Sequence, residues 1–156
     1  MSTPYIDQSK LASIKTYMLI AFIFNLLGMI GFALAGIWEI YAWSTFAGYY
    51  DYFGAYVAGY ATGILITGII LLVWFIMALL IFLRVRKMHA AADRGDIATL
   101  KQYNNMMWAI LALIFTGVIS GIMLLISFGP INDLGRAPAY APAPGQYAPP
   151  PPPPQY

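Results

Sequence analysis

The chain has 156 residues, of which 61% are hydrophobic and only 9% are charged, with a formal net charge of +2. Soluble domains are about 45–50% apolar, and a domain this small cannot bury such an excess, so the composition favours an integral membrane protein. The small net charge argues against a nucleic-acid partner, and the lack of cysteine excludes disulfides and thiolate chemistry.

Three long stretches without charged side chains are separated by shorter segments. Each stretch supplies the roughly 20 apolar residues that a helix needs to cross about 30 Å of hydrocarbon. Because the bilayer core offers no partner to free backbone groups, we predict an all-α polytopic membrane protein with three transmembrane helices and a disordered Pro-rich C-terminal tail. In chain order the predicted segments are an N-terminal cytoplasmic segment (1–15), the first transmembrane helix (16–38), an aromatic external loop (39–52), the second transmembrane helix (53–83), a basic cytoplasmic helical hairpin turn (84–105), the third transmembrane helix (106–128) and the tail (129–156).

The first stretch has one alternative interpretation, a cleavable signal peptide. Lys10 and Lys15 give it a basic start, and the residues ALAG at 33–36 are similar to a cleavage site. However, its apolar part is longer than the roughly 7–15 residues of a signal peptide, and it contains Asn25. These features favour a helix that stays in the chain.

The distribution of Lys and Arg predicts the orientation, because basic residues near span ends are retained in the cytoplasm. Lys10 and Lys15 precede the first stretch and further basic residues follow the second, whereas the loop over 39–52 carries only acids. We predict a multi-pass protein of the cell membrane with a cytoplasmic N-terminus and an external C-terminal tail. A four-span alternative divides 39–83 into two helices; it places the basic segment opposite the N-terminus and is disfavoured.

Aromatic residues crowd the first loop and its flanks. Rings with a polar edge prefer the headgroup zone, so an interfacial belt accounts for them. Because Tyr and Trp also dominate binding hot spots, a surface that contacts a protein partner is the alternative. The candidate contact residues in this region are Tyr49, Tyr50, Tyr52 and Tyr56.

In the basic segment nothing stops a helix until Gly95, which adopts the left-handed conformation at low cost. Asp96 can then cap the next helix through its carboxylate. We expect the second helix to extend to about Arg94 and the third to begin near Ile97. The basic charges attract anionic lipid headgroups at about 1 kcal/mol each, which requires no specific lipid.

Small residues recur at four-residue spacing in all three stretches. In lipid, close backbone approach at small residues supplies much of the packing between helices. We expect these ridges to pack helices within one chain, with homo-oligomerisation as the alternative. The candidate packing residues are Gly31, Ala35, Ala55, Gly59, Gly63, Gly117 and Gly121.

The tail from Ala137 onward contains only Ala, Pro, Tyr, Gly and Gln. Proline fixes φ and removes a hydrogen-bond donor, so we expect polyproline II or coil. The last four residues match the P-P-x-Y pattern that WW-type domains bind, which makes Pro153, Pro154 and Tyr156 candidate partner contacts. A flexible spacer is the alternative.

No group of residues in the sequence predicts catalysis, a cofactor or a metal site. His89 has only Asp93 one turn away, whereas metal sites usually need three or four ligands. Catalytic triads, phosphate loops and HExxH motifs are not evident. Ionisable groups within spans indicate transport paths, and none lies at mid-depth. Glu39, at the outer edge of the first stretch, and Asn25 are the candidates for a pore or vestibule.

The segments RGDIATLK, WAILALIFTGVISGIMLLI and APPPPPPQY resemble, in their layout, small multi-spanning prokaryotic membrane proteins of unknown function with Pro/Tyr-rich tails. The resemblance covers the second half of the chain and implies no activity. We predict a non-enzymatic membrane protein that acts as an interaction or assembly module. Its expected partners are membrane lipids and a protein, which is either a different protein or a second copy of the chain. The alternative is a subunit of an oligomeric channel or transporter.

Overall fold

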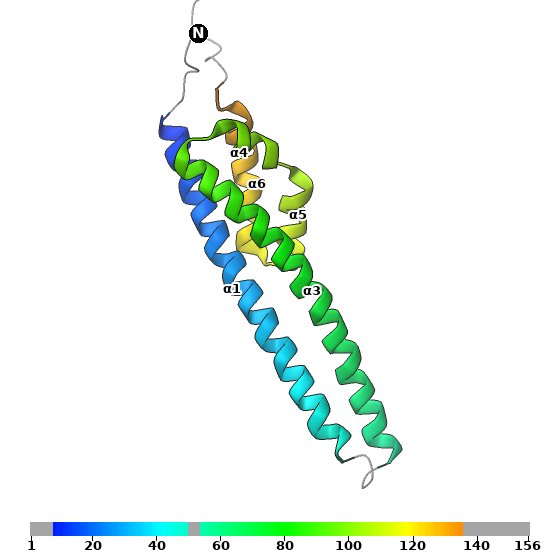
Figure 1. Ribbon diagram of the computed structural model, residues 1–156. Helices are drawn as coiled ribbons and strands as arrows, with labels where there is room; N and C mark the ends of the chain where they lie inside the picture. Colours follow the sequence, from blue (N-terminus) through cyan, green and yellow to red (C-terminus); the bar gives the residue numbers. More distant parts are fainter. Residues whose placement is uncertain (1–7, 50–53, 136–156) are drawn as a thin grey trace, which may run out of the picture.

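The structure is a computed structural model that describes residues 8–49 and 54–135, apart from the side chain of residue 56. Within these ranges the chain is all-helical and contains no strand. The helices shown in Figure 1 are α1 (Gln8–Ala47), α3 (Ala55–Arg94), α4 (Ile97–Tyr103), α5 (Met106–Phe115) and α6 (Val118–Asp133). The predicted tail beyond residue 135 lies outside the described residues.

Helices α1 and α3 run side by side in opposite directions along the whole length of the molecule (Figure 1). Each has 40 residues, which at 1.5 Å per residue corresponds to about 60 Å. Both are long and apolar enough to cross a membrane. The first two predicted stretches therefore lie in two long helices. Helix α1 extends beyond both ends of its predicted stretch (16–38), whereas α3 begins close to the predicted start (53) and continues past 83 to Arg94, as expected.

The turn after α3 forms as the sequence predicts. Helix α3 ends at Arg94, and Gly95 adopts the left-handed conformation with φ of 69°. The Asp96 side chain accepts a hydrogen bond of 3.0 Å from the backbone N–H of Thr99 and so caps α4. Hydrogen bonds from the side chain and backbone of Thr99 hold the pKa of Asp96 below its ordinary value. The predicted helix end, glycine and cap are confirmed.

The third predicted stretch does not form one helix. Helix α5 ends at Phe115, and α6 begins at Val118 after a break at Thr116 and Gly117. Gly117 has φ of 117° and ψ of 157°, a region that only glycine adopts readily. The chain reverses there, so α6 packs against α5 and returns to the end of the bundle where α1 begins (Figure 1). The prediction of one continuous helix over 106–128 is wrong.

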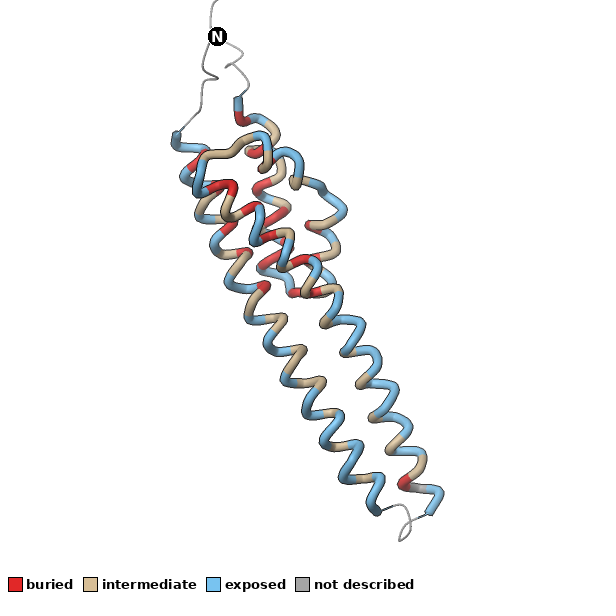
Figure 2. Tube along the Cα trace, viewed as in Figure 1, coloured by how far each residue is buried: buried red, intermediate tan, exposed pale blue. Residues whose placement is uncertain are grey.

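Burial divides the molecule into two parts (Figure 2). We call α1 up to Gly28, α3 from Ala78, and α4 to α6 the packed half; the rest of α1 and α3 is the two-helix half. The contiguous cluster of buried core residues lies entirely in the packed half, because only there do further helices cover the α1–α3 pair; Val57 is the one described buried hydrophobic residue of the two-helix half. The members of the cluster are Leu11, Ile14, Met18, Ala21, Ile81, Val85, Met88, Ala91, Ala92, Leu100, Ala109, Ala112, Leu124, Ile131 and Leu134.

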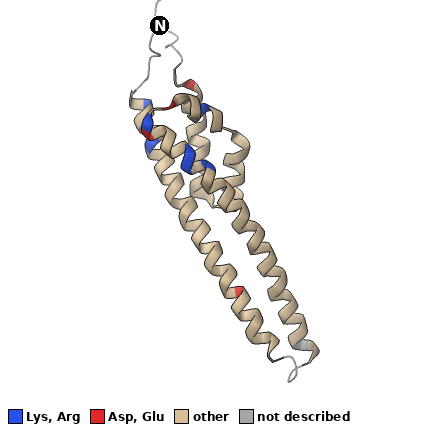
Figure 3. Cartoon of the chain, in the orientation of Figure 1, with Lys and Arg blue, Asp and Glu red and all other residues tan. Residues whose placement is uncertain are grey.

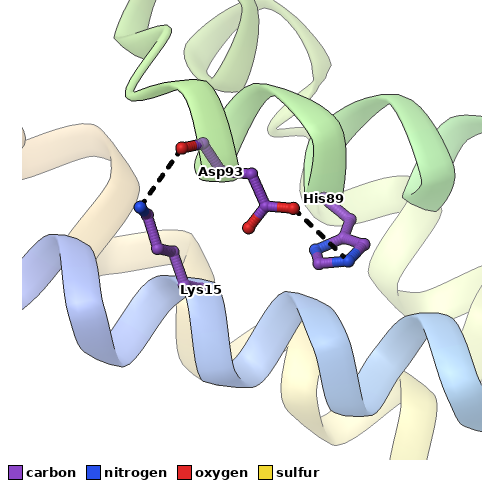
Figure 4. Close-up of polar contacts among 3 residues, drawn as sticks. All are labelled: Lys15, His89 and Asp93. Atoms are coloured by element: carbon purple, nitrogen blue, oxygen red, sulfur yellow. Dashed lines mark hydrogen bonds and ion pairs between the residues drawn. The ribbon is translucent and has the colours of Figure 1, made fainter.

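Charge follows the same division (Figure 3). Among the described residues, Glu39 is the one charged side chain of the two-helix half. In the packed half, the charged side chain of Lys15 also joins α1 to α3 (Figure 4). Lys15 Nζ donates to the backbone oxygen of Asp93 at 3.2 Å, and the Asp93 carboxylate lies 3.6 Å from His89 Nε2. The His89 ring is half-buried against Phe22 of α1, with centroids 5.4 Å apart.

Candidate functional site

The tip of the α5–α6 hairpin is held against α1 by close backbone contact. A Cβ added at Gly28 would lie 2.9 Å from the backbone oxygen of Thr116, and one added at Gly121 would overlap the backbone of Leu113. Both positions therefore require glycine for the helices to approach this closely. The break itself is satisfied internally, since the N–H groups of Thr116 and Gly117 both donate to the oxygen of Ala112.

A buried polar contact joins α1 to α6 just beside this tip. Asn25 Nδ2 donates to the oxygen of Ala21 at 2.9 Å and to Ser120 Oγ, and both polar side chains are fully buried. Its Oδ1 has no hydrogen-bond partner within the described part of the chain. In a low-dielectric interior such a contact fixes the register between helices. In one chain Asn25 thus acts in helix packing and does not line either of the open hollows of the two-helix half.

The tip of the hairpin lies at the middle of both long apolar stretches. Gly28, which contacts the tip, is near the middle of the predicted first stretch (16–38). Trp74, near the middle of the most apolar part of the second stretch (64–83), packs edge-to-face on Phe115 at 5.6 Å. The hairpin therefore enters from the charged end of the bundle and turns back about half way along it.

The two-helix half carries an open apolar hollow between α1 and α3. Its volume is about 430 Å³, and its lining includes Phe32, Gly36, Glu39, Ile64, Gly68 and Phe75. A second hollow of about 410 Å³ shares Glu39 and Ile64 with the first and includes Gly59, Gly63 and Thr67. Two of the predicted packing residues, Gly59 and Gly63, are thus brought together with the vestibule candidate Glu39, on a surface that the described helices do not cover.

Glu39 is the side chain that the two hollows have in common. Its Cβ is 3.8 Å from where a Cβ on Gly68 would lie, so the carboxylate-bearing residue packs against a glycine of the opposite helix. The described part of the chain provides no hydrogen bond or ion pair to its carboxylate. A carboxylate between apolar walls is costly to leave without a partner, which marks it as a site for further contact.

The predicted packing glycines divide into two classes. At Gly31, Gly59 and Gly63 an added Cβ would meet nothing within 4 Å, so they are not points of close approach within one chain. Gly117 forms the turn and Gly121 the close crossing. Ala35 is half-buried and Ala55 exposed. The close contact at Gly28 was not predicted from the sequence. The available signal was its position about one turn after Asn25, a polar residue in an apolar stretch that the structure shows to be buried.

Most of the predicted partner contacts lie outside the described residues. This holds for Tyr50, Tyr52, Pro153, Pro154 and Tyr156, and for the side chain of Tyr56. Tyr49 is described and half exposed. Nearby, Phe46 and Tyr60 pack edge-to-face at 4.8 Å and connect α1 to α3 at this end.

At the opposite end Arg84 holds the end of α4 and the start of α5 to α3. Its Nε and Nη2 both donate to the oxygen of Tyr103, at 3.1 and 2.8 Å. The guanidinium also lies over the rings of Tyr103 and Trp108, at 5.1 and 5.0 Å from their centroids. This clamp combines paired hydrogen bonds with cation–π contact, for which arginine is better suited than lysine.

No family model, curated protein or solved structure matches the chain. The likeness in layout to small multi-spanning prokaryotic proteins therefore stays a prediction, and the functional argument rests on the geometry described above.

Proposed function

We propose that the chain is a non-enzymatic integral membrane protein with two spans and one re-entrant helical hairpin, and that it acts as an interaction or assembly module. Helices α5 and α6 have 10 and 16 residues, fewer than the roughly 20 needed for a span, and short apolar helices of this kind are typical of re-entrant segments. At the break Thr116 is buried and Gly117 is exposed. The Gly117 N–H donates to the oxygen of Ala112 and the Gly117 oxygen accepts from the N–H of Gly121, so this exposed backbone is satisfied internally, as lipid requires.

The uncovered hollows of the two-helix half are the observation that supports an assembly role. Large apolar side chains are exposed along both helices here; Leu34, Ile37 and Ile40 are 63%, 64% and 69% exposed. Lipid alone covers such side chains well. Acyl chains, however, cannot supply the Glu39 carboxylate with a hydrogen-bond donor or use the open glycines for close contact.

The partner that fits this surface is a transmembrane helix with small residues and a hydrogen-bond donor. A second copy of the chain offers both, because Gly59, Gly63 and Tyr60, whose hydroxyl is a hydrogen-bond donor, line one hollow with Glu39. We therefore propose self-association through this half, in which Glu39 of one copy accepts a hydrogen bond from the other.

Cysteine crosslinking in native membranes tests this proposal, because the chain has no cysteine of its own. Gly36→Cys places a thiol in the larger hollow. Ile70→Cys is the matched control. Because Gly68 of α3 lies opposite Glu39 of α1, Ile70 is at a depth similar to that of Gly36. Ile70 is exposed but lines neither hollow. We expect oxidation to crosslink the Gly36 variant and not the Ile70 variant. A chain that crosslinks at neither position and migrates as a strict monomer contradicts the proposal.

Orientation forms a second part of the proposal. The basic residues gather at the end where α1 begins and where α6 ends, so the positive-inside rule favours a cytoplasmic location for both (Figure 3). The tail would then leave the membrane on the cytoplasmic side and present its P-P-Q-Y ending to an intracellular partner. This differs from the external tail expected from the sequence, because that expectation counted 106–128 as a full span.

Impermeant maleimide labelling of intact cells tests the orientation. Ala47→Cys reports on the end of α1 and Ala98→Cys on α4, and both positions are exposed; Gln146→Cys reports on the tail. We expect Ala47→Cys to react on intact cells, and the other two variants to react only after lysis. Labelling of both Ala47→Cys and Gln146→Cys on intact cells would instead support the three-span arrangement predicted from the sequence.

A subunit of an oligomeric channel or transporter is the second candidate function. It is favoured by the position of Glu39 in both hollows, where several copies would place carboxylates around a shared path. In reconstituted vesicles this function requires ion flux that decreases in Glu39→Gln. Absence of flux, or flux that the substitution leaves unchanged, excludes it.

A further inference from the structure

A basic pocket lies between α3 and α4, at the charged end of the bundle. Its volume is about 440 Å³, and Arg86, Lys87 and Arg94 line it from α3. Thr99, Gln102 and Tyr103 of α4 line the opposite side. No acidic residue of the described chain lines this pocket, so it concentrates positive charge beside polar side chains.

Within the described residues the Asp96 carboxylate interacts electrostatically with Arg94, and the remaining positive charge of the pocket is not neutralised. Asp93 is paired with His89, and Asp96 accepts hydrogen bonds at the start of α4. Lys87 Nζ is held 3.4 Å from the Tyr103 hydroxyl and 5.5 Å from its ring centroid, which orders the ammonium without cancelling its charge. Ion pairs to Arg86 and Arg94 are not found in the described ranges.

An apolar stripe runs along α3 directly below the pocket. From Lys87 the positions 83, 80, 76 and 73 follow at alternating four- and three-residue steps, so they share one face of the helix. These side chains, Leu83, Leu80, Ile76 and Val73, are 44%, 45%, 47% and 51% exposed. Leu83 belongs both to this stripe and to the pocket lining.

We propose that this pocket binds the phosphate group of an anionic phospholipid, whose acyl chain lies along the stripe below. Arginine guanidinium groups bind phosphate oxygens through paired hydrogen bonds, and Lys87 supplies a point charge. Basic pockets beside membrane helices bind phosphorylated headgroups in this way. A soluble phosphate would use the cations alone, whereas a phospholipid uses the stripe as well. The inference rests on the proposed membrane location and is independent of self-association and of orientation.

Native mass spectrometry of the full chain in a non-ionic detergent tests the site. Phosphatidylglycerol, phosphatidylcholine and inorganic phosphate are titrated separately. The variant Arg86→Gln/Arg94→Gln removes two charges from the pocket. The control Lys10→Gln/Lys101→Gln removes two charges from the same end of the molecule without touching the pocket lining. Circular dichroism establishes that both variants keep the helical content of the parent chain.

The parent chain is expected to bind one phosphatidylglycerol more tightly than phosphatidylcholine, and the pocket variant to bind it roughly 30-fold more weakly. The control is expected to change affinity by less than about threefold, since its charges act only at long range. Equal losses in both variants, or equal affinity for the two lipids, would overturn the site. Displacement of the lipid by equimolar inorganic phosphate would overturn the role of the stripe. If the chain instead leaves native membranes without detergent, that result counts against the membrane location itself.

Discussion

The packed half and the two-helix half share the long helices α1 and α3, yet small residues have opposite roles in them. Gly28 and Gly31 are three residues apart on α1. A Cβ on Gly28 would collide with the Thr116 carbonyl, whereas a Cβ on Gly31 would meet nothing within 4 Å. The difference arises from the α5–α6 hairpin, which covers the α1–α3 pair only half way along its length. The comparison teaches that spacing identifies small residues able to pack, while the neighbouring helix decides which of them do.

The largest effect is expected from Gly117→Ala, which attacks the turn that creates the packed half. Alanine at φ of 117° costs about 1–3 kcal/mol, whereas in a continuous helix over 106–133 it is well tolerated. We expect the segment to straighten into a span and the tail to change sides. Gln146→Cys should then become reactive on intact cells. Gly129→Ala, at an exposed helical position in α6, is the control and should leave the labelling unchanged.

A smaller effect is expected from Gly121→Ala, which separates α5 from α6 without altering the turn. The added methyl group overlaps the Leu113 backbone, and overpacking of this kind typically costs about 1–3 kcal/mol. We expect a clearly lower midpoint of unfolding in detergent. Gly63→Ala in the two-helix half adds the same methyl group to open space and should leave the midpoint nearly unchanged. An equal decrease in both variants would contradict the distinction between the two halves.

Gly28→Ala and Gly31→Ala sharpen the comparison within one helix. The Gly28 methyl group would press on the Thr116 carbonyl at 2.9 Å, which relaxes by a small shift of the hairpin tip and costs about 1 kcal/mol. Gly31→Ala should not destabilise the purified monomer. If Gly31→Ala instead decreases crosslinking at Gly36→Cys in membranes, it extends the proposed interface along α1.

The smallest effect is expected from Asp96→Ala, at the cap of α4. The pKa of Asp96 is lower in the folded chain than in the unfolded one, so its stabilising contribution is complete above the unfolded value. That contribution is lost as the pH falls through the folded value. We expect a slightly lower melting temperature than the parent at neutral pH and the same temperature in strong acid. Asp96→Asn, which keeps an oxygen acceptor for the Thr99 N–H, should lose less.

A feature could be predicted from the sequence when it depends only on residues that are neighbours in the chain. The end of α3, the left-handed Gly95 and the Asp96 cap follow from neighbouring residues, so they were predictable. The break at Gly117 was not, because glycine is common within membrane helices and the flanking residues are as apolar as those of a continuous span. Asn25 was predicted as a candidate for a pore or vestibule. Its burial against Ser120 could not be predicted, because that contact depends on a residue far along the chain.

The sequence by itself determined that residues 8–49 and 54–135 are built from helices and that two of these helices are long and apolar, since both features follow from charge-free stretches whose length is a local property. It also determined the basic character of one end, because the Lys and Arg residues are close together in the chain. Tertiary structure alone decided that the third stretch folds back and that Gly28 is a contact while Gly31 is open. It also decided that Arg86 and Arg94 share a pocket with Gln102. The physical reason is that each of these depends on which helices meet, and a bilayer-compatible sequence allows both a span and a hairpin until the neighbouring helix selects one.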